Sequence, residues 1–161
     1  MVDLFSGIGG FSLVAQWCWG DGLEIEAFVE IDPFCQKVLA KNFPGMPIYD
    51  DIKKIQWVVT DTNGDFRQSS SPQQDQRGIP VENKQTVEAK SIDLLTGGFP
   101  CQPFSCAGKR AGTEDDRHLW PEMLRTIHEV KPRWIVAENV PGLLTLQDGM
   151  VFRSLISLSG V

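Results

Sequence analysis

MVDLFSGIGGFSLVAQWCW, residues 1–19, is the stretch of sequence that decides the fold. Its first five residues predict a short strand, the glycines Gly7, Gly9 and Gly10 a tight turn, and the apolar residues after them a helix. A helix that begins in a glycine turn presents backbone amides to nucleotide-like ligands. The spacing G-x-G-G differs from the G-x-G-x-x-G of dinucleotide-binding proteins, so a plain strand-to-helix turn remains the alternative.

The next apolar run, LEIEAFVE, ends in Glu30. This acid follows the glycines by about twenty residues, the spacing of a carboxylate that accepts hydrogen bonds from ribose hydroxyls. Asp32 precedes a proline and is predicted instead to cap a helix over residues 34–42. Glu30 is therefore the candidate ribose ligand.

A third strand is predicted near residues 47–49, and Asp51 and Ile52 follow it. Their place at a strand end suits a contact with adenine. Turn carboxylates are common in solvated loops, so an ordinary loop is the alternative.

GGFPCQPFS, residues 97–105, places Cys101 between two prolines. The preceding IDLLT, residues 92–96, is typical of a buried strand, and the prolines stiffen the loop beyond its carboxyl end. Cys101 is thus expected to be presented by the loop at the sheet edge where ligands bind, and not to be packed in the core. Cys18 and Cys35 lie in apolar helical patterns and are expected in the core.

The spacing of cysteines and histidines predicts no metal site. Cys101 and Cys106 form a C-x4-C pair, which matches neither the redox C-x-x-C spacing nor half of a zinc site. His118 and His128, with nine residues between them, do not fit the zinc-finger pattern.

A last motif, RWIVAENVPGLL, predicts a buried strand over residues 134–137 with Glu138 and Asn139 at its end. Glu138 is expected to face the cleft of Cys101, where partial desolvation would let a carboxyl group stay protonated and act as an acid. The alternative is a solvated Glu138 beside a turn-forming Asn139.

The order of these segments predicts an α/β fold with a doubly wound, mostly parallel, Rossmann-like sheet. Its strands are expected near residues 1–5, 23–29, 47–49, 92–97 and 134–138, in the order 3-2-1-4-5, with helices on both faces. Residues 60–90 are rich in Ser, Gln, Asp and Gly and are expected to form a mobile polar insertion that cannot bury a core.

Composition agrees with a cytoplasmic α/β protein. The 161 residues are 42% hydrophobic and contain no run long enough to cross a membrane. Four cysteines without a secretory signal indicate a reducing compartment. The net charge of -6 is unfavourable for binding nucleic acid, whose phosphates are contacted by Lys and Arg.

Together and in this order, the motifs resemble the cytosine-5 DNA methyltransferase family of bacteria and phages. DLFSGIGGFS resembles its cofactor motif, GGFPCQPFS its nucleophile loop and AENVPGLL its glutamate motif, while residues 108–120 are similar to its mobile DNA-closing loop. The resemblance implies transfer of a methyl group from S-adenosyl-L-methionine to C5 of cytosine in double-stranded DNA. It also implies a covalent adduct between Cys101 and C6 of a base flipped out of the duplex.

The resemblance implies a role for each site residue. The catalytic residues are Cys101, Glu138 and Asn139, of which Asn139 steadies the Pro-Cys loop. The cofactor-binding residues are Phe5, Ser6, Gly7, Gly9, Gly10, Glu30, Ile31, Asp51, Ile52, Gly98, Pro100 and Leu119. Among these, Phe5 would stack on adenine and Ile31 would flank it. Gly98, Pro100 and Leu119 would line the methyl end.

The resemblance covers a front half, so residues 1–161 are expected to form a partial catalytic domain without a target-recognition domain. A missing C-terminal half or a separate complementing chain is the expected partner besides DNA. A restriction-modification or phage setting is implied. Two alternatives remain: a tRNA cytosine-5 methyltransferase with the same motifs, and a non-catalytic cofactor-binding remnant.

Overall fold

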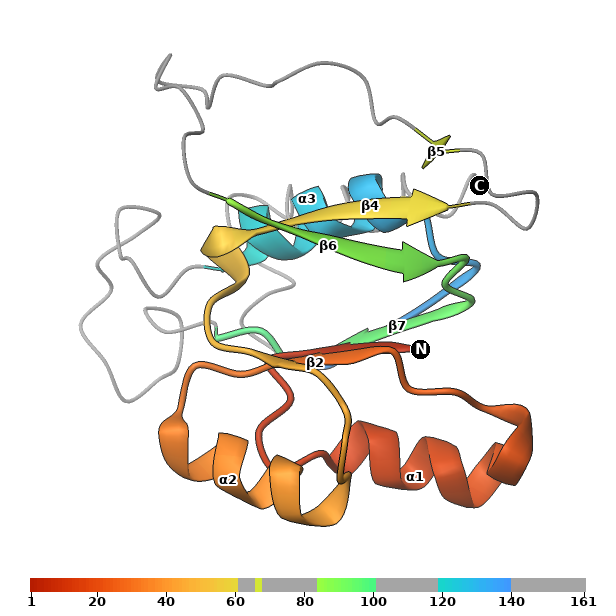
Figure 1. The fold of residues 1–161 in the computed structure, drawn as a ribbon, viewed down its shortest axis with the longest axis vertical. Coiled ribbons are helices and arrows are strands. Elements are labelled where there is room, and N and C mark those ends of the chain that lie inside the picture. The colour runs from red at the N-terminus through yellow and green to blue at the C-terminus, as the bar shows by residue number, and fades with distance from the viewer. Residues whose placement is uncertain (61–65, 68–83, 101–118, 140–161) are drawn as a thin grey trace.

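The computed structural model describes residues 1–60, 66–67, 84–100 and 119–139 (Figure 1). Its elements run in chain order β1 (Val2–Leu4), α1 (Gly10–Trp19), η1 (Gly20–Gly22), β2 (Ala27–Val29), α2 (Pro33–Asn42), β3 (Ile48–Tyr49), η2 (Ile52–Lys54), β4 (Ile55–Thr60), β5 (Phe66–Arg67), β6 (Gln85–Lys90), β7 (Leu94–Gly97), α3 (Trp120–Val130) and β8 (Trp134–Ala137). The two η elements are short 3-10 helices. None of the described helices is both apolar enough and long enough to traverse a bilayer.

The main sheet has the order β3-β2-β1-β7-β8, and all its strand pairs are parallel. Since β7 and β8 are the fourth and fifth strands of this sheet, the predicted order 3-2-1-4-5 is confirmed. The strands are shorter than predicted. The difference is largest at β2, which begins at Ala27, where its register with Val2 of β1 starts.

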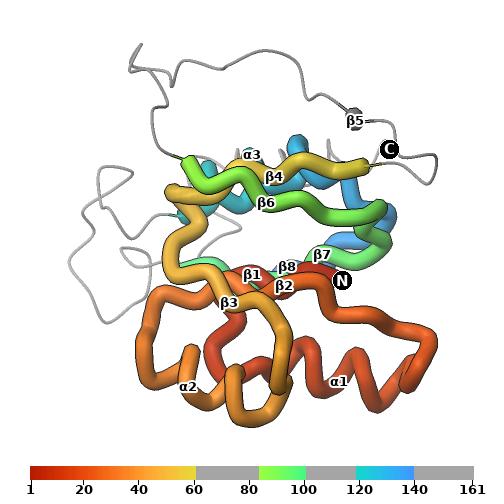
Figure 2. Tube along the Cα trace, viewed as in Figure 1, coloured from red at the N-terminus to blue at the C-terminus, as the bar shows by residue number. Residues whose placement is uncertain are grey.

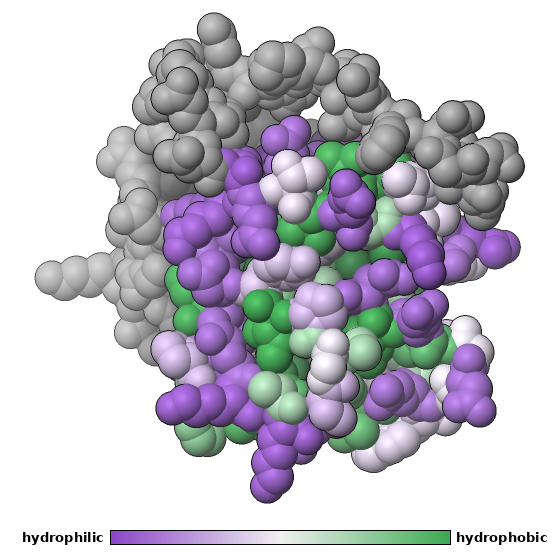
Figure 3. Space-filling view, viewed as in Figure 1, coloured by the Kyte–Doolittle hydropathy of each residue, from purple (hydrophilic) through white to green (hydrophobic). Residues whose placement is uncertain are grey.

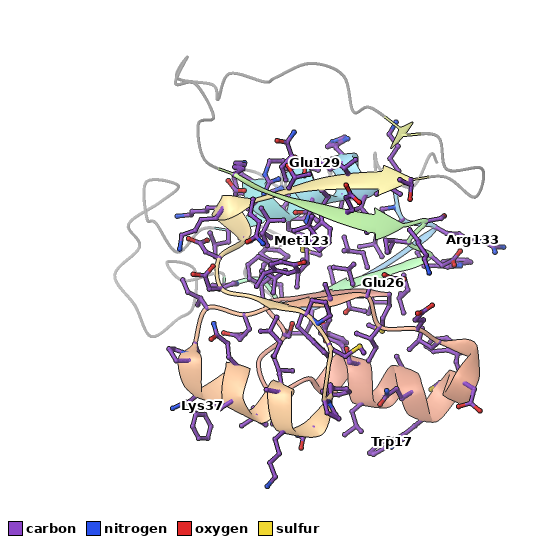
Figure 4. All side chains as sticks on the ribbon, viewed as in Figure 1. Trp17, Glu26, Lys37, Met123, Glu129 and Arg133 are labelled. Atoms are coloured by element: carbon purple, nitrogen blue, oxygen red, sulfur yellow. The ribbon has the colours of Figure 1, made fainter. Side chains whose placement is uncertain are left out.

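Two apolar layers hold the main sheet in place (Figures 1 and 2). Helices α1 and α2 cover one face and enclose a core of Met1, Ala15, Ile25, Phe28, Leu39 and Phe43. The other face is covered by α3 together with β4 and β6, over a larger core that includes Val2, Leu4, Trp57 and Met123. Met123 points from α3 toward the main sheet, whereas Trp17 points away from it (Figure 4).

The expected insertion over residues 60–90 differs from the structure at its end. Gln85–Lys90 is strand β6, which pairs in parallel with β4 from Ile55↔Gln85 to Thr60↔Lys90. Val87 and Ala89 alternate with polar neighbours and are buried, so this stretch does contribute to a core. Within the same stretch, Thr60 ends β4 and Phe66–Arg67 is strand β5, which pairs antiparallel with β4. Residues 61–65 and 68–83 lie outside the described residues.

Two burial predictions were wrong. Cys18 is exposed and Cys35 is half-buried, because α1 turns only Ser12 and Ala15 inward and α2 only Leu39. Strand β8, predicted to be buried, has Trp134 at 63% exposure, as expected of an edge strand that pairs with β7 alone among the described strands. On the face seen in Figure 3, hydrophobic side chains gather toward the middle and hydrophilic ones toward the margins.

Candidate cofactor and catalytic site

The candidate residues meet at the carboxyl edge of the main sheet because its strands end in one row. The last paired residues of the five strands are Leu4, Val29, Tyr49, Gly97 and Ala137. The residues that follow them in the chain are Phe5, Glu30, Asp50, Gly98 and Glu138. Ligands of open α/β sheets bind in the crevice at this edge. The structure therefore places the ends of all five strands, and the residues that directly follow them, at one edge of the sheet.

The glycine turn has an unusual backbone. Gly7 and Gly9 adopt positive φ of 55° and 89°, and so does Phe5, at 52°. Positive φ is strained for a bulky residue and persists mainly where surroundings or function demand it. Ser6 is buried: its hydroxyl donates to the carbonyl oxygen of Asp3 at 2.6 Å, its amide donates to that of Val29 at 3.1 Å, and its carbonyl oxygen accepts from the amide of Gly9 at 2.8 Å, so the polar groups of Ser6 hold the turn together.

Glu30 lies next to this turn as predicted. Its Oε2 accepts from the amide of Gly7 at 2.7 Å and its Oε1 from the amide of Asp32 at 2.8 Å. A carboxylate offers about four acceptor positions, so these two bonds leave capacity for ribose hydroxyls. Asp32 caps α2, accepting from the amides of Phe34 and Cys35, as predicted. The ribose role of Glu30 stays a prediction.

The candidate adenine-contacting residues that follow β2 and β3 differ in how exposed their side chains are. Ile31 is 70% exposed beside Glu30, which leaves its side chain available to a ring. Asp51 caps η2 by accepting from the amide of Lys53 at 2.9 Å. The side chain of Ile52 is buried in the larger core, so a contact from Ile52 would have to come from its backbone.

The end of β8 holds the loop that leads to the candidate nucleophile. Asn139 donates from Nδ2 to the carbonyl oxygen of Phe99 at 2.8 Å, and a Cβ added at Gly98 would lie 3.1 Å from Oε2 of Glu138. The ring of Phe99 packs on Trp120, with 5.3 Å between centroids. The approach to Pro100 is thus fixed by a hydrogen bond, a close carboxylate and an aromatic contact.

Several predicted features are not placed by the structure. Cys101 and residues 108–118 of the predicted DNA-closing loop lie outside the described residues, whereas Trp120, the last residue of that predicted loop, is buried at the start of α3. Leu119 stands at the start of α3, where its carbonyl oxygen accepts from the amide of Met123 at 3.1 Å. Glu138 is exposed, which does not agree with the expected partial desolvation of its carboxyl group.

Asp3 is a site residue that sequence reasoning missed. Its side chain is fully buried, and it accepts from the hydroxyl of Ser12 in α1 at 2.8 Å and from that of Thr96 in β7 at 2.7 Å. One carboxylate therefore ties the strand before the glycine turn to the helix after it and to the strand before the Pro-Cys loop. The signal in the sequence was an acid inside the apolar run MVDLF.

Burial raises the pKa of Asp3 above its ordinary value, and the bonds from Thr96 and Ser12 oppose that rise. A raised pKa in the folded state means that this group's contribution to stability is fully present below the unfolded-state pKa of about 4 and is lost as pH rises through the folded-state value. We expect Asp3→Asn, which does not titrate, to gain in free energy of unfolding relative to wild type as pH increases from 4 to 7.

Urea unfolding at a series of pH values measures this difference, which amounts to about 1.4 kcal/mol for each unit by which the pKa is raised. Asp21→Asn is the control, because Asp21 is exposed in η1 and its replacement leaves the buried network intact. A stability difference between Asp3→Asn and wild type that is flat across this range would contradict the prediction.

Over residues 1–158 the chain matches the family described as C-5 cytosine-specific DNA methylase. The type II methyltransferase M2.BsuMI of Bacillus subtilis is 34% identical over 163 residues, covering 98% of this chain and 33% of the relative. M.AquIA of Picosynechococcus is 31% identical over 159 residues, covering 98% of this chain and 54% of the relative. The chain thus spans about a third of the length of M2.BsuMI and about half of M.AquIA.

Solved structures share the fold. A putative DNA modification methyltransferase encoded within an Escherichia coli prophage superposes with a TM-score of 0.60 at 28% identity, covering 99% of this chain and 37% of that one. A Spodoptera frugiperda DNMT2 variant superposes with a TM-score of 0.56 at 22% identity, covering 98% of this chain and 40% of that one. The second likeness shows the fold alone.

Proposed function

Because the chain belongs to the C-5 cytosine-specific DNA methylase family, we propose that it binds S-adenosylmethionine at the carboxyl edge of the main sheet and methylates C5 of cytosine in double-stranded DNA. The single row of strand ends carries this proposal. It brings Glu30 and the glycine turn to the same edge as Gly98, Glu138 and the loop that continues to Cys101.

The residues at this edge fit the cofactor. The amide of Gly7, in the turn after β1, donates to the carboxylate of Glu30, directly after β2. This bond places a carboxylate beside the turn, where a ribose would lie. The exposed Ile31 supplies an apolar surface for adenine. When bound, S-adenosylmethionine supplies the electrophilic methyl group that C5 of the activated cytosine takes.

The protein's own residues activate the cytosine, which is a poor nucleophile at C5. The Cys101 thiolate adds to C6 and forms an S–C6 bond, so that an electron pair becomes available at C5. Glu138 hydrogen-bonds or protonates N3, which limits the negative charge that gathers on the ring. After methylation a base removes the C5 proton, the C5–C6 double bond reforms, and Cys101 leaves as a thiolate.

Asn139 prepares the nucleophile loop for this reaction. The bond from Asn139 to the carbonyl oxygen of Phe99 restrains the chain two residues before Cys101. The target cytosine must leave the duplex to reach the loop, and the lost stacking and pairing cost about a few kcal/mol. A restrained loop reduces the additional entropy that must be lost when the thiolate meets the flipped base.

The relatives are longer than the region that this chain matches. We assign DNA recognition to a segment that corresponds to their additional length, located either in the same chain or in a complementing one. The net charge of -6 supports this assignment, because contacts with DNA phosphates require Lys and Arg, and these residues are outnumbered by Asp and Glu in this chain.

Incorporation of labelled methyl groups into duplex DNA, compared with tRNA, tests the substrate. Methylation of tRNA alone would replace DNA by RNA in the proposal. Cofactor binding without any methyl transfer would favour the alternative that the chain is a non-catalytic cofactor-binding remnant.

We expect Glu30→Ala to weaken S-adenosylmethionine binding by roughly 10-fold to 100-fold, because hydrogen bonds to a charged partner are lost. Isothermal calorimetry measures the change. Glu26→Ala is the matched control. Glu26 is an acid that directly precedes β2, at the amino edge of the main sheet, whereas the glycine turn lies at the carboxyl edge (Figure 4).

The affinities for adenosine and for 2′-deoxyadenosine distinguish the loss of a ribose contact from a general loosening of the glycine turn, because only adenosine has the 2′-hydroxyl. Wild type should prefer adenosine, and Glu30→Ala should lose that preference. Equal affinities of wild type and Glu30→Ala for S-adenosylmethionine would remove Glu30 from the ribose role.

A further inference from the structure

Arg125 of α3 forms an unusually complete set of contacts near the site. Its Nε donates to Oε2 of Glu122 at 2.8 Å and its Nη1 to Oε1 of Glu129 at 2.8 Å. Its Nη2 donates to the carbonyl oxygen of Ile52 at 2.7 Å. The side chains of the three charged residues are between 14% and 26% exposed, so these ion pairs are largely shielded from water.

The two carboxylates determine where the guanidinium points. Glu122 and Glu129 lie three residues before and four residues after Arg125 on the same helix, positions that share a helix face. Burial alone would lower the pKa of Arg125, but Glu129 and Glu122 raise it above its usual value, so the group remains charged. Held by both acids, the planar group has its remaining nitrogen aimed at η2.

The carbonyl group that receives this bond belongs to the candidate adenine loop. Ile52 follows Asp51 directly, and both come just after the row of strand ends. Glu129, which lies beside β4 in Figure 4, also accepts from the amide of Trp57 at 3.0 Å. Helix α3 therefore restrains the stretch from Ile52 to Trp57 at two backbone positions.

We propose that Arg125 is a positioning residue for the adenine end of the cofactor, because it fixes the backbone of Ile52 and with it the place of Asp51. This inference rests on the proposed function. Helix α3 starts directly after Leu119, which the family resemblance assigns to the methyl end. The same helix thus holds one end of the candidate cofactor site through Arg125 and begins directly after a candidate residue of the other end.

Arg125→Lys tests the inference, because lysine keeps a positive charge near the acids but lacks the branched nitrogen that donates to Ile52. We expect the dissociation constants for adenosine and for S-adenosylmethionine to rise by the same factor, roughly 10-fold. Calorimetry measures both at a temperature where circular dichroism shows folded protein. Arg125→Met, which has no donor, should give the same loss independently.

Glu122→Gln is the matched control. It removes one ionic partner of Arg125 but keeps an amide oxygen that can accept from Nε, so the guanidinium keeps its orientation and its bond to Ile52. Adenosine affinity should therefore stay within about 2-fold of wild type even if the melting temperature falls. An Arg125→Lys protein that binds adenosine like wild type overturns the inference. An equal loss in Glu122→Gln also overturns it, because the effect would then be a general loosening of α3. Wild type that binds neither ligand overturns the proposed function itself.

Discussion

Replacing Cys101 by serine is expected to abolish methyl transfer and the covalent trapping of DNA that carries 5-fluorocytosine at the target position. A serine hydroxyl is a far weaker nucleophile than a thiolate, so no bond to C6 would form. In the wild-type reaction, fluorine occupies the place of the C5 proton and cannot leave as a cation, so the elimination that would release Cys101 is blocked and the enzyme stays attached after methylation. A denaturing gel measures the attached fraction.

The other cysteines are the controls for this experiment. Cys18 is exposed on α1 and Cys35 is half-buried on α2, and both helices lie on the face of the sheet opposite α3. Replacement of either by serine should leave trapping unchanged. Cys106, outside the described residues, should also be dispensable, because only Cys101 stands between two prolines after a strand.

The assay needs both the chain alone and the chain joined to the C-terminal region of M2.BsuMI, since the chain covers 33% of that relative. Trapping in either form that disappears in Cys101→Ser supports the proposed mechanism. Trapping that survives Cys101→Ser or moves to Cys106 contradicts it. A wild-type chain that traps DNA in neither form contradicts it as well.

The main sheet was predictable because each of its strands carries its own local signal. An apolar run that ends in a polar or glycine-rich loop identifies a parallel strand and its carboxyl end without knowledge of its neighbours. The choice between Glu30 and Asp32 followed from capping chemistry: an acid before a proline caps a helix, and Asp32 does so in the structure.

Strand β6 and its pairing in the second sheet were not predictable from local signals. In β6 only Val87 and Ala89 are buried, and the strand exists because it pairs with β4 about thirty residues away. Such a pairing depends on a distant partner, and a polar sequence alone does not reveal it. The strand IQWVVT itself alternates buried and half-buried residues from Ile55 to Thr60, a pattern that could have identified β4.

The buried polar contacts were also out of reach. Asp3 needs Ser12 and Thr96, and Arg125 needs the carbonyl oxygen of Ile52; in each case the partners come from different elements. The pattern Glu122, Arg125 and Glu129 does predict ion pairs along a helix. It does not predict that the third contact of Arg125 reaches the candidate adenine loop, because that contact depends on how α3 packs against η2 and β4.

Gly9→Ala is expected to lower the free energy of unfolding by about 2–5 kcal/mol, a large share of the stability of an ordinary domain. Gly9 has φ of 89°, which strains any side chain, and an added Cβ would lie 2.6 Å from Cε2 of Phe43 and 3.0 Å from Cδ2 of Leu39. Leu39 is fully buried and the ring of Phe43 packs on Phe28 at 4.9 Å, so neither can easily move aside.

Neighbouring glycines separate the two causes of this loss. Gly7 also has positive φ but open space around its Cβ position, so Gly7→Ala should lose about 1–2 kcal/mol from strain alone. Gly10 begins α1 with open space and no positive φ, so Gly10→Ala should stay within about 0.5 kcal/mol of wild type. Urea unfolding of the three variants gives the comparison. If Gly9→Ala loses no more than Gly7→Ala, then Phe43 and Leu39 yield to the new methyl group, and packing of α2 does not set the place of the glycine turn.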